Sequence, residues 1–176
     1  YLPLQLAVES SYQLSLAEDI HIQASDAEAA LTPFLQHIFR KRQFRPLQAQ
    51  GVINVLHNTD SIVLLPTGAG KSIIYQLAGL LMPGVTLVVD PIVSLIEDQI
   101  EGLLQYGIDR AVGITSALST PEERERLLRG VERGAYQFVL HSPERLQSPA
   151  FRNALRALAE TSKVNLAVID EAHCVS

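Results

Sequence analysis

From residue 61 onward, short apolar runs alternate with longer segments whose apolar residues recur at helical spacing. Short apolar runs bounded by turn residues favour buried strands, whereas a three-to-four-residue repeat favours amphipathic helices. The apolar runs predict strands over residues 61–65, 85–90, 110–115, 136–141 and 164–170. The helical repeats predict helices over residues 71–82, 92–106, 120–133 and 149–160. Continuous apolar strands that alternate with helices indicate an α/β fold, a parallel sheet with helices on both faces.

Residues 1–30 follow a different pattern, because apolar and polar residues alternate over much of this segment. Such alternation predicts one or two short strands. Thr32 followed by Pro33 is a typical helix start, with threonine as the cap and proline at the first helical position. A second helix is expected after Pro46. We therefore expect residues 1–38 to form a short N-terminal extension and residues 39–176 to form the α/β domain.

The composition narrows the classes of partner that the protein can have. The net charge is −5, so nucleic-acid binding would depend on a local patch such as Arg40–Arg42 with Arg45, which is otherwise a solvated helix end. The most apolar stretch, residues 77–89, is interrupted by Pro83 and Gly84 and is too short to cross a membrane. The single cysteine cannot form an internal disulfide, which fits a reducing compartment. We expect a cytoplasmic or nucleoid-associated protein, or a nuclear one in a eukaryote.

Residues 66–72 read Pro-Thr-Gly-Ala-Gly-Lys-Ser between a predicted strand and a predicted helix. Glycines let the backbone approach an anion without a Cβ, and the successive amides and the helix N-terminus would face the phosphates of ATP. Lys71 would reach the β- and γ-phosphates, and Ser72 would ligate Mg²⁺. Leu65 stands where the strict phosphate-loop pattern has glycine, and the alternative is a glycine-rich turn without a ligand. The residues predicted to bind the phosphates are Thr67, Gly68, Ala69, Gly70, Lys71 and Ser72.

A second motif, Asp170-Glu171-Ala172-His173, follows the last predicted strand. In open α/β sheets, reactive groups gather beyond the carboxyl ends of the strands, and the phosphate loop is expected at the same edge. Asp170 could hold Mg²⁺ directly or through water, and Glu171 could position and deprotonate the attacking water. The alternative is a pair of acids that merely ends a strand. Together the two motifs predict a nucleoside triphosphatase.

The run of residues 170–176, Asp-Glu-Ala-His-Cys-Val-Ser, resembles motif II of the RecQ-like DNA helicases of superfamily 2. Three other blocks resemble motifs 0, Ia and Ib of that family in the expected order. These blocks are Phe44–Gln48, Asp90–Gln99 and Ser142–Leu146. The resemblance covers residues 39–176 and implies the first RecA-like lobe of a helicase, with the family's remaining motifs and its second lobe lying beyond this chain.

The resemblance also implies roles for individual residues. Gln48 would hydrogen-bond the adenine, and Arg45 would pack near the base or the ribose. His173 would couple the nucleotide state to nucleic-acid binding. Segments that face the nucleic-acid backbone in the family contain Pro91, Ser94, Gln99, Ser142 and Pro143. Simpler interpretations are a surface helix cap for Arg45 and a helix N-cap for Ser94.

The function implied is that of an ATP-dependent motor that uses ATP and Mg²⁺ to move along single-stranded or forked DNA. Lys41 replaces the family's aromatic residue near adenine, which affects the expected adenine preference. The second RecA-like lobe would supply an arginine finger, so residues 1–176 alone should bind nucleotide weakly and hydrolyse little. Two alternatives remain at this stage: an RNA helicase or duplex translocase, and a non-catalytic nucleic-acid-binding scaffold that keeps the fold.

Overall fold

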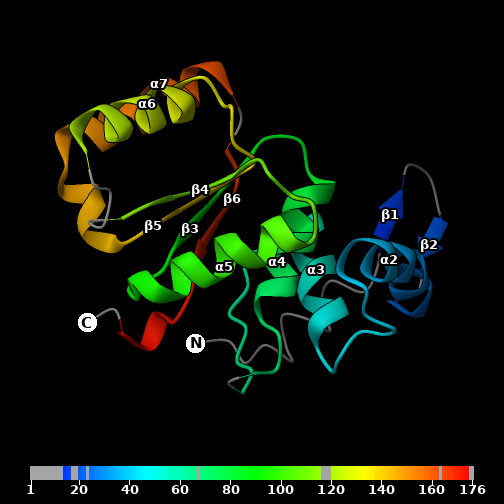
Figure 1. The fold of residues 1–176 in the computed structure, drawn as a ribbon. Coiled ribbons are helices and arrows are strands. Elements are labelled where there is room, and N and C mark those ends of the chain that lie inside the picture. Colours follow the sequence, from blue (N-terminus) through cyan, green and yellow to red (C-terminus); the bar gives the residue numbers. More distant parts are fainter. Residues whose placement is uncertain are drawn as a thin grey trace. The chain divides into compact units, whose positions relative to one another are not determined.

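The computed structural model describes residues 14–16, 20–22, 24–66, 68–115, 120–162 and 164–174. By their internal contacts they divide into two compact units, residues 1–82 and residues 83–176. Figure 1 shows the helices and strands of both units along the chain. No helix in the described ranges is both long enough and apolar enough to cross a membrane.

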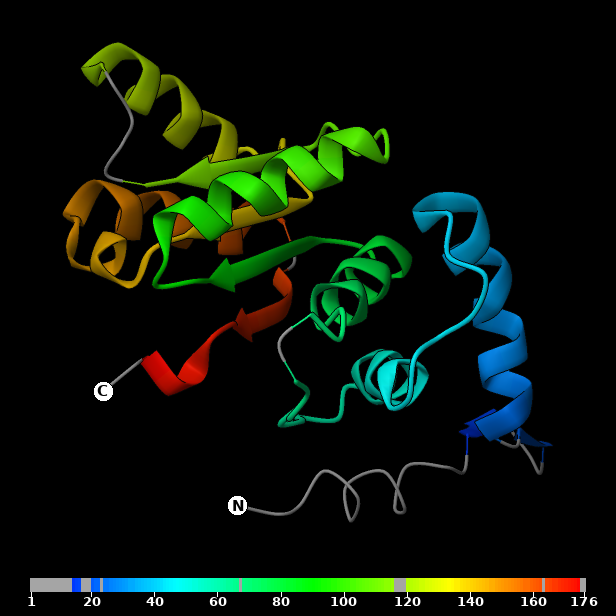
Figure 2. The same cartoon turned by 60° about the horizontal axis from the view of Figure 1, so that its bottom comes forward.

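The first unit contains a short antiparallel strand pair followed by three helices. The strands are β1 (Leu14–Leu16) and β2 (Ile20–Ile22). The helices are α2 (Ala24–Phe39), α3 (Gln48–Leu56) and α4 (Ser72–Leu81). Figure 2 shows α3 and α4 side by side. They approach closely because Gly51 of α3 faces Ile74 of α4, and a Cβ at Gly51 would lie 2.9 Å from the Ile74 Cγ2. This contact fixes the helix that begins at the end of the predicted phosphate loop.

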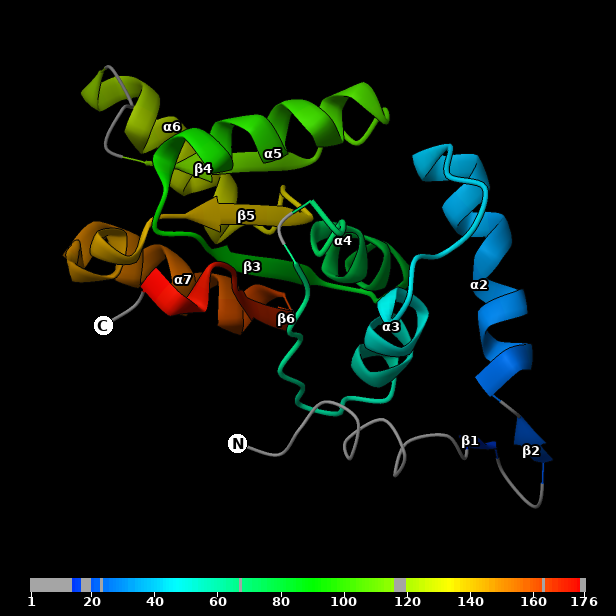
Figure 3. The same cartoon turned by 90° about the horizontal axis from the view of Figure 1, so that it is seen from below.

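The second unit is a four-stranded parallel sheet in the order β4-β5-β3-β6, which Figure 3 shows edge to edge. The strands are β3 (Val85–Val89), β4 (Ala111–Ile114), β5 (Phe138–His141) and β6 (Val164–Ile169). The helices are α5 (Val93–Gln105), α6 (Pro121–Glu132) and α7 (Pro149–Thr161). Two short 3₁₀ turns, η1 (Pro143–Gln147) and η2 (Ala172–Cys174), follow β5 and β6. The predicted α/β fold is confirmed, and these strands and helices lie within two residues of the predicted ranges.

Helices cover both faces of this sheet, with α6 and α7 on one side and α5 on the other (Figure 1). The core between the sheet and the α6–α7 pair contains the fully buried side chains of Phe151, Ala154 and Leu158. On the opposite face, α5 buries Ile96 and Leu103. Burial of such apolar side chains is the main force that holds the strand ends in place.

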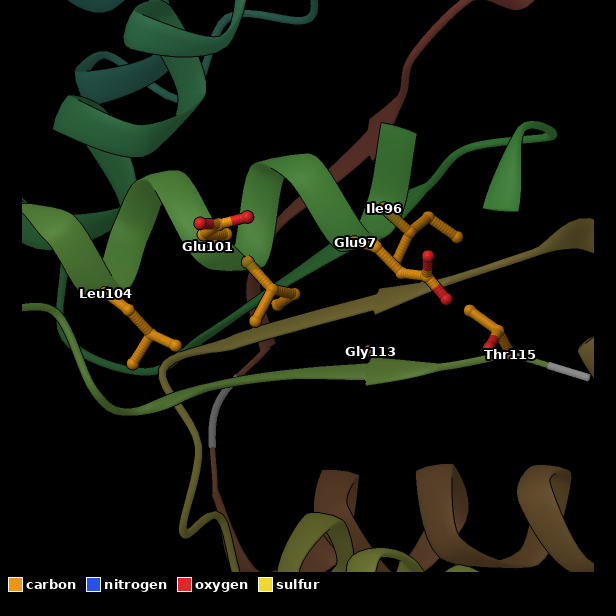
Figure 4. Close-up of a pocket in the computed structure, with 7 residues that line it drawn as sticks. Ile96, Glu97, Glu101, Leu104, Gly113 and Thr115 are labelled. Carbon is orange, nitrogen blue, oxygen red and sulfur yellow. The ribbon is translucent and has the colours of Figure 1, made fainter. Parts of the chain in front are cut away.

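A shallow groove of about 290 Å³ runs between α5 and β4. Figure 4 shows that Glu97 and Glu101 lie along the α5 wall of this groove, with Gly113 on the strand opposite and Thr115 just after that strand. Gly113 lets α5 approach the strand, because a Cβ there would lie 3.0 Å from the Ile96 Cγ2. None of the residues that line the groove belongs to the predicted site.

Two sequence predictions about elements are wrong. Residues 61–65 form no strand, since none of the described strands pairs with them, and the side chains of Ile62 and Leu64 are exposed. An apolar run predicts burial, but a strand also needs a partner for its backbone groups.

The second wrong prediction is the helix start at Thr32. Helix α2 begins at Ala24 and continues through Pro33. Its buried stripe repeats every fourth residue across the proline, and consists of Ala27, Leu31, Leu35 and Phe39. Proline cannot donate the usual backbone hydrogen bond inside a helix, and the Thr32 hydroxyl instead donates to the Glu28 carbonyl at 2.8 Å. Continuous burial outweighs the local start signal.

Candidate nucleotide site

The predicted phosphate loop is a tight backbone turn that ends at the start of α4. Gly68 and Gly70 have φ values of +76° and +80°, which are left-handed conformations that glycine adopts without strain. The Ala69 N–H donates to the Pro66 carbonyl at 3.1 Å and closes the turn. Lys71 is the N-cap and Ser72 the first residue of α4. Thr67 lies outside the described residues.

The motif 0 residues Arg45 and Gln48 hold the phosphate loop by its backbone carbonyl groups. The Gln48 side-chain amide donates to the Ala69 carbonyl at 3.0 Å and to the Gly70 carbonyl at 2.9 Å. Its side-chain oxygen accepts from the Arg45 N–H at 2.8 Å, and the Arg45 guanidinium donates to the Gly68 carbonyl. Gln48 is 4% exposed, so its side chain is buried against the loop, whereas Arg45 is exposed. The proposed surface-cap alternative for Arg45 does not account for its contact with Gly68.

This contact sets the direction of the loop amides. In a trans peptide the N–H points away from the carbonyl of the preceding residue. Because the Ala69 and Gly70 carbonyls face Gln48, the N–H groups of Gly70 and Lys71 point away from it. Backbone N–H groups presented together at a helix N-terminus form an anion site. Gly70 must also remain glycine, because a Cβ would lie 2.7 Å from the Gln48 Nε2.

In the second unit, polar residues follow the carboxyl ends of three neighbouring strands: Asp90 after β3, Ser142 after β5 and Asp170 after β6. The backbone ties them together, since the Asp90 N–H donates to the His141 carbonyl at 3.0 Å and the Asp170 N–H donates to the Val89 carbonyl at 2.9 Å. Asp90 and Ser142 are fully buried. The sequence analysis did not single out Asp90, although its position directly after an apolar strand is the signal that finds it.

Asp170 and Glu171 lie in the turn after β6. Both are half-buried, and one Asp170 carboxylate oxygen accepts from the Glu171 N–H at 2.9 Å. Glu171 has a φ of +46°, which is uncommon outside glycine, and its carbonyl accepts from the Cys174 N–H at 2.8 Å. The backbone therefore leaves the extended conformation of β6 at Glu171, and the two carboxylates do not follow the regular alternation of strand side chains. The side chain of His173 lies outside the described part of the chain.

Oxygen donors are present for the Mg²⁺ that the sequence predicts. Among the described residues, no three His, Cys, Asp or Glu side chains gather into a cluster that could hold an ion. Magnesium is usually bound by one or two protein oxygens together with substrate phosphates and water. The Ser72 hydroxyl and the Asp170 carboxylate are ligands of that kind.

The residues predicted to face nucleic acid differ in exposure. Ser94 is exposed, whereas Pro91, Gln99 and Pro143 are half-buried and Ser142 is fully buried. The alternative for Ser94 is wrong, because the N-cap of α5 is Ile92, whose N–H donates to Asp90 at 2.9 Å. Nucleic-acid contact by these residues stays a prediction.

At the end of β5, His141 and Ser142 are buried and the nearby Glu144 is exposed. The Ser142 hydroxyl donates to the Glu144 carboxylate at 2.6 Å, and this hydrogen bond lowers the pKa of Glu144 below its usual value. Burial lowers the pKa of His141 below its ordinary value, against the opposing effects of the Ser142 carbonyl and the Glu144 charge. The His141 ring packs edge-on against Phe151, with 4.9 Å between ring centroids. The end of β5 is thereby rigidly anchored in the core.

Comparison with known proteins gives one family and a consistent set of relatives. The family model for the DEAD/DEAH box helicases matches residues 45–176. The chain is 36% identical over 98% of its length to ATP-dependent DNA helicase Q-like 5 of Arabidopsis thaliana, and covers 18% of that protein. It is 39% identical over 81% of its length to two Bacillus subtilis proteins, the probable helicase RecS and the helicase RecQ, covering 27% and 23% of them. The chain thus spans about a quarter or less of these relatives.

Proposed function

This chain belongs to the DEAD/DEAH box helicase family, as the resemblance of its motifs predicted, and we propose that it is the ATP-binding lobe of a RecQ-type DNA helicase. In this proposal Mg-ATP hydrolysis drives movement along single-stranded DNA. The names of the relatives support DNA as the substrate, since each is called an ATP-dependent DNA helicase. The protein would therefore work beside DNA, in the nucleoid or the nucleus.

The observation that carries the proposal is the phosphate loop held by motif 0. Gln48 fixes the carbonyl groups of Ala69 and Gly70, and this leaves the amides of the loop directed away from motif 0. A loop with that geometry, continued by Lys71 and a helix N-terminus, binds the phosphates of a nucleotide. In the contact with adenine that the family resemblance implies, the Gln48 side-chain oxygen would accept from the base, because both N–H groups of the amide already donate to the loop.

Hydrolysis would then be divided among four side chains. Lys71 stabilises the negative charge of the β- and γ-phosphates. Ser72 and Asp170 provide oxygen ligands for Mg²⁺, which supplies charge neutralisation on the phosphate oxygens when it is bound. Glu171 orients the attacking water and accepts its proton. His173, beside them in the sequence, would connect this site to the nucleic acid.

The proposed motor needs a second RecA-like lobe for its transition state. The transferred phosphoryl group carries charge on three oxygens, and an arginine finger commonly meets that charge. We propose that the second lobe supplies this arginine. Single-stranded or forked DNA would bind along a path that the two lobes form together. The exposed Ser94 at the start of α5 is the most accessible of the predicted DNA contacts.

The test is ATP hydrolysis by the full-length protein alone and with single-stranded DNA, duplex DNA or RNA, together with a strand-separation assay on forked DNA. The matched control is Glu171→Gln, which keeps the size of the side chain and removes the base. DNA-stimulated hydrolysis that the Glu171→Gln variant loses would support the proposal. Stimulation by RNA alone would indicate an RNA motor, and stimulation by duplex DNA without strand separation would indicate a duplex translocase. Nucleotide binding without hydrolysis under every condition would indicate a non-catalytic scaffold.

A further inference from the structure

Gln99 lies between two carboxylates that come from different strands. Its side-chain nitrogen is 3.2 Å from an oxygen of Asp90, after β3, and 3.4 Å from an oxygen of Asp170, after β6. Gln99 itself belongs to the second turn of α5. A single amide from the helix therefore spans the ends of two neighbouring parallel strands, and one of its partners is the carboxylate expected to hold Mg²⁺.

The hydrogen-bonding capacities of these groups match. A glutamine amide nitrogen carries two N–H groups, so it can donate to both carboxylates at once. It is also neutral, so it joins two negative groups without adding charge. A lysine in this place would add a positive charge beside Asp170, and a glutamate would add repulsion. A neutral amide can therefore hold both carboxylates without changing the net negative charge beside the predicted metal ligand.

Asp90 is the fixed end of this arrangement. It is fully buried, and its two carboxylate oxygens accept from the Ile92 N–H at 2.9 Å and from Gln99. A buried carboxylate held by a backbone donor at the start of a helix has little freedom to move. Asp170 is half-buried and accepts from the Glu171 N–H on its other oxygen. Gln99 thus connects the half-buried Asp170 to the fully buried Asp90.

We propose that Gln99 is a positioning residue for Asp170, which it holds in one orientation by anchoring it to Asp90. This inference rests on the proposed function, because it takes Asp170 as a metal-binding residue. Side chains that hydrogen-bond a metal ligand fix its orientation and raise metal affinity. The motif Ia glutamine would then act on the metal side of the site, whereas the sequence comparison of motifs placed it at the nucleic-acid backbone.

The experiment measures how much Mg²⁺ is needed for the full-length protein to bind a fluorescent, non-hydrolysable ATP analogue. Gln99→Met removes both donors at nearly constant size, and Gln99→Asn keeps the amide on a shorter stem. The control is Gln105→Met, an exposed glutamine at the end of the same helix. We expect Gln99→Met to raise the half-saturating Mg²⁺ concentration by about tenfold, which is the low end for a partner of a metal ligand. Gln99→Asn should give a smaller rise, and Gln105→Met none.

Two further measurements separate positioning from a merely structural role. Binding of the analogue without Mg²⁺ should be unchanged in Gln99→Met, since the phosphate loop contacts remain. In an Asp170→Asn background, Gln99→Met should cause no additional rise, because the two residues act through one interaction. If Gln99→Met fails to fold, Gln99→Asn carries the same two comparisons.

The outcomes for the inference and for the proposed function are distinguishable. Wild-type protein that binds the analogue with Mg²⁺, together with an unchanged Mg²⁺ requirement in the Gln99 variants, overturns the inference alone. Equal losses with and without Mg²⁺ also overturn it, because they indicate general damage. Wild-type protein that binds no nucleotide overturns the proposed function and the inference with it.

Discussion

At the scale of single residues, Gln48 has the clearest measurable role, because its side chain makes two hydrogen bonds to the phosphate loop. Gln48→Ala removes both, and each such bond contributes about 1 kcal/mol net. We therefore expect nucleotide affinity to fall by roughly tenfold or more, measured by titration with a fluorescent nucleotide. Gln50→Ala is the matched control, since Gln50 lies on the same helix and is only half-buried. Equal affinity in Gln48→Ala and wild type would contradict this role.

His141 gives a prediction about pH. Burial lowers its pKa in the folded state below the ordinary value of 6.5, so the unfolded chain binds a proton more readily. Stability from this residue is fully present above pH 6.5 and is lost as the pH falls through the lowered folded value. We expect the free energy of unfolding, measured by denaturant titration, to fall between neutral and mildly acidic pH. The fall should be shallower in His141→Gln, and an identical slope in both proteins would refute this assignment.

The residue types of the site were readable from the sequence, but their contacts were not. Gly68, Gly70 and Lys71 follow from the loop motif, because a backbone that wraps an anion needs glycine and a cation. The network around Gln99 depends on how α5 lies over the strand ends, and this arrangement has no local sequence signal. Motif comparison assigned Gln99 a place facing nucleic acid, whereas its side chain contacts Asp90 and Asp170.

At the scale of elements, two glycines in helices predict opposite effects of the same substitution. Gly51→Ala in α3 places a methyl group 2.9 Å from the buried Ile74 of α4. Overpacking costs about 1–3 kcal/mol, which exceeds the gain of up to about 1 kcal/mol in helix propensity. Gly102→Ala in α5 meets nothing within 4 Å. We expect Gly51→Ala to lower and Gly102→Ala to raise the melting temperature, and the same sign for both would contradict this account.

Elements were predictable from the sequence where local pattern and burial agree. The four strands of the sheet form where the apolar runs predict them, because each strand pairs with a neighbouring strand and packs against a helix. The run at residues 61–65 carries the same local pattern but pairs with none of the described strands. Helix α2 shows the converse, since its stripe of buried residues continues through Pro33. Both failures arise because long-range packing decides between alternatives that local sequence leaves open.

At the scale of the whole molecule, the family assignment concerns a chain that covers between 18% and 27% of three of its relatives. The net charge of the chain agrees with the proposal that this lobe is one part of a two-lobed motor. Its net charge is −5, so binding of DNA cannot come from a general positive field. In the proposed motor, DNA binding would come from local contacts such as the exposed Arg40–Arg42 segment and from the proposed second lobe. In the same way, the residues needed for ATP hydrolysis would be shared between the two proposed lobes.

Residues 1–176 expressed alone should bind nucleotide yet hydrolyse it far more slowly than the full-length protein. Lys71 is the cation of the phosphate loop, and charge that develops on the transferred phosphoryl group needs a further cation. An arginine finger contributes about 10³-fold or more to turnover, so we expect a deficit of at least that order in steady-state phosphate release.

Circular dichroism would first establish that the isolated chain is folded, and nucleotide titration would establish that its phosphate loop binds. Glu171→Gln in the same chain reports any contaminating hydrolase, because it should abolish only hydrolysis that uses this site. Hydrolysis by residues 1–176 at the rate of the full-length protein, and lost in Glu171→Gln, would mean that this lobe contains every catalytic group. In that case a second lobe would serve movement along DNA alone, and the finger would not be required.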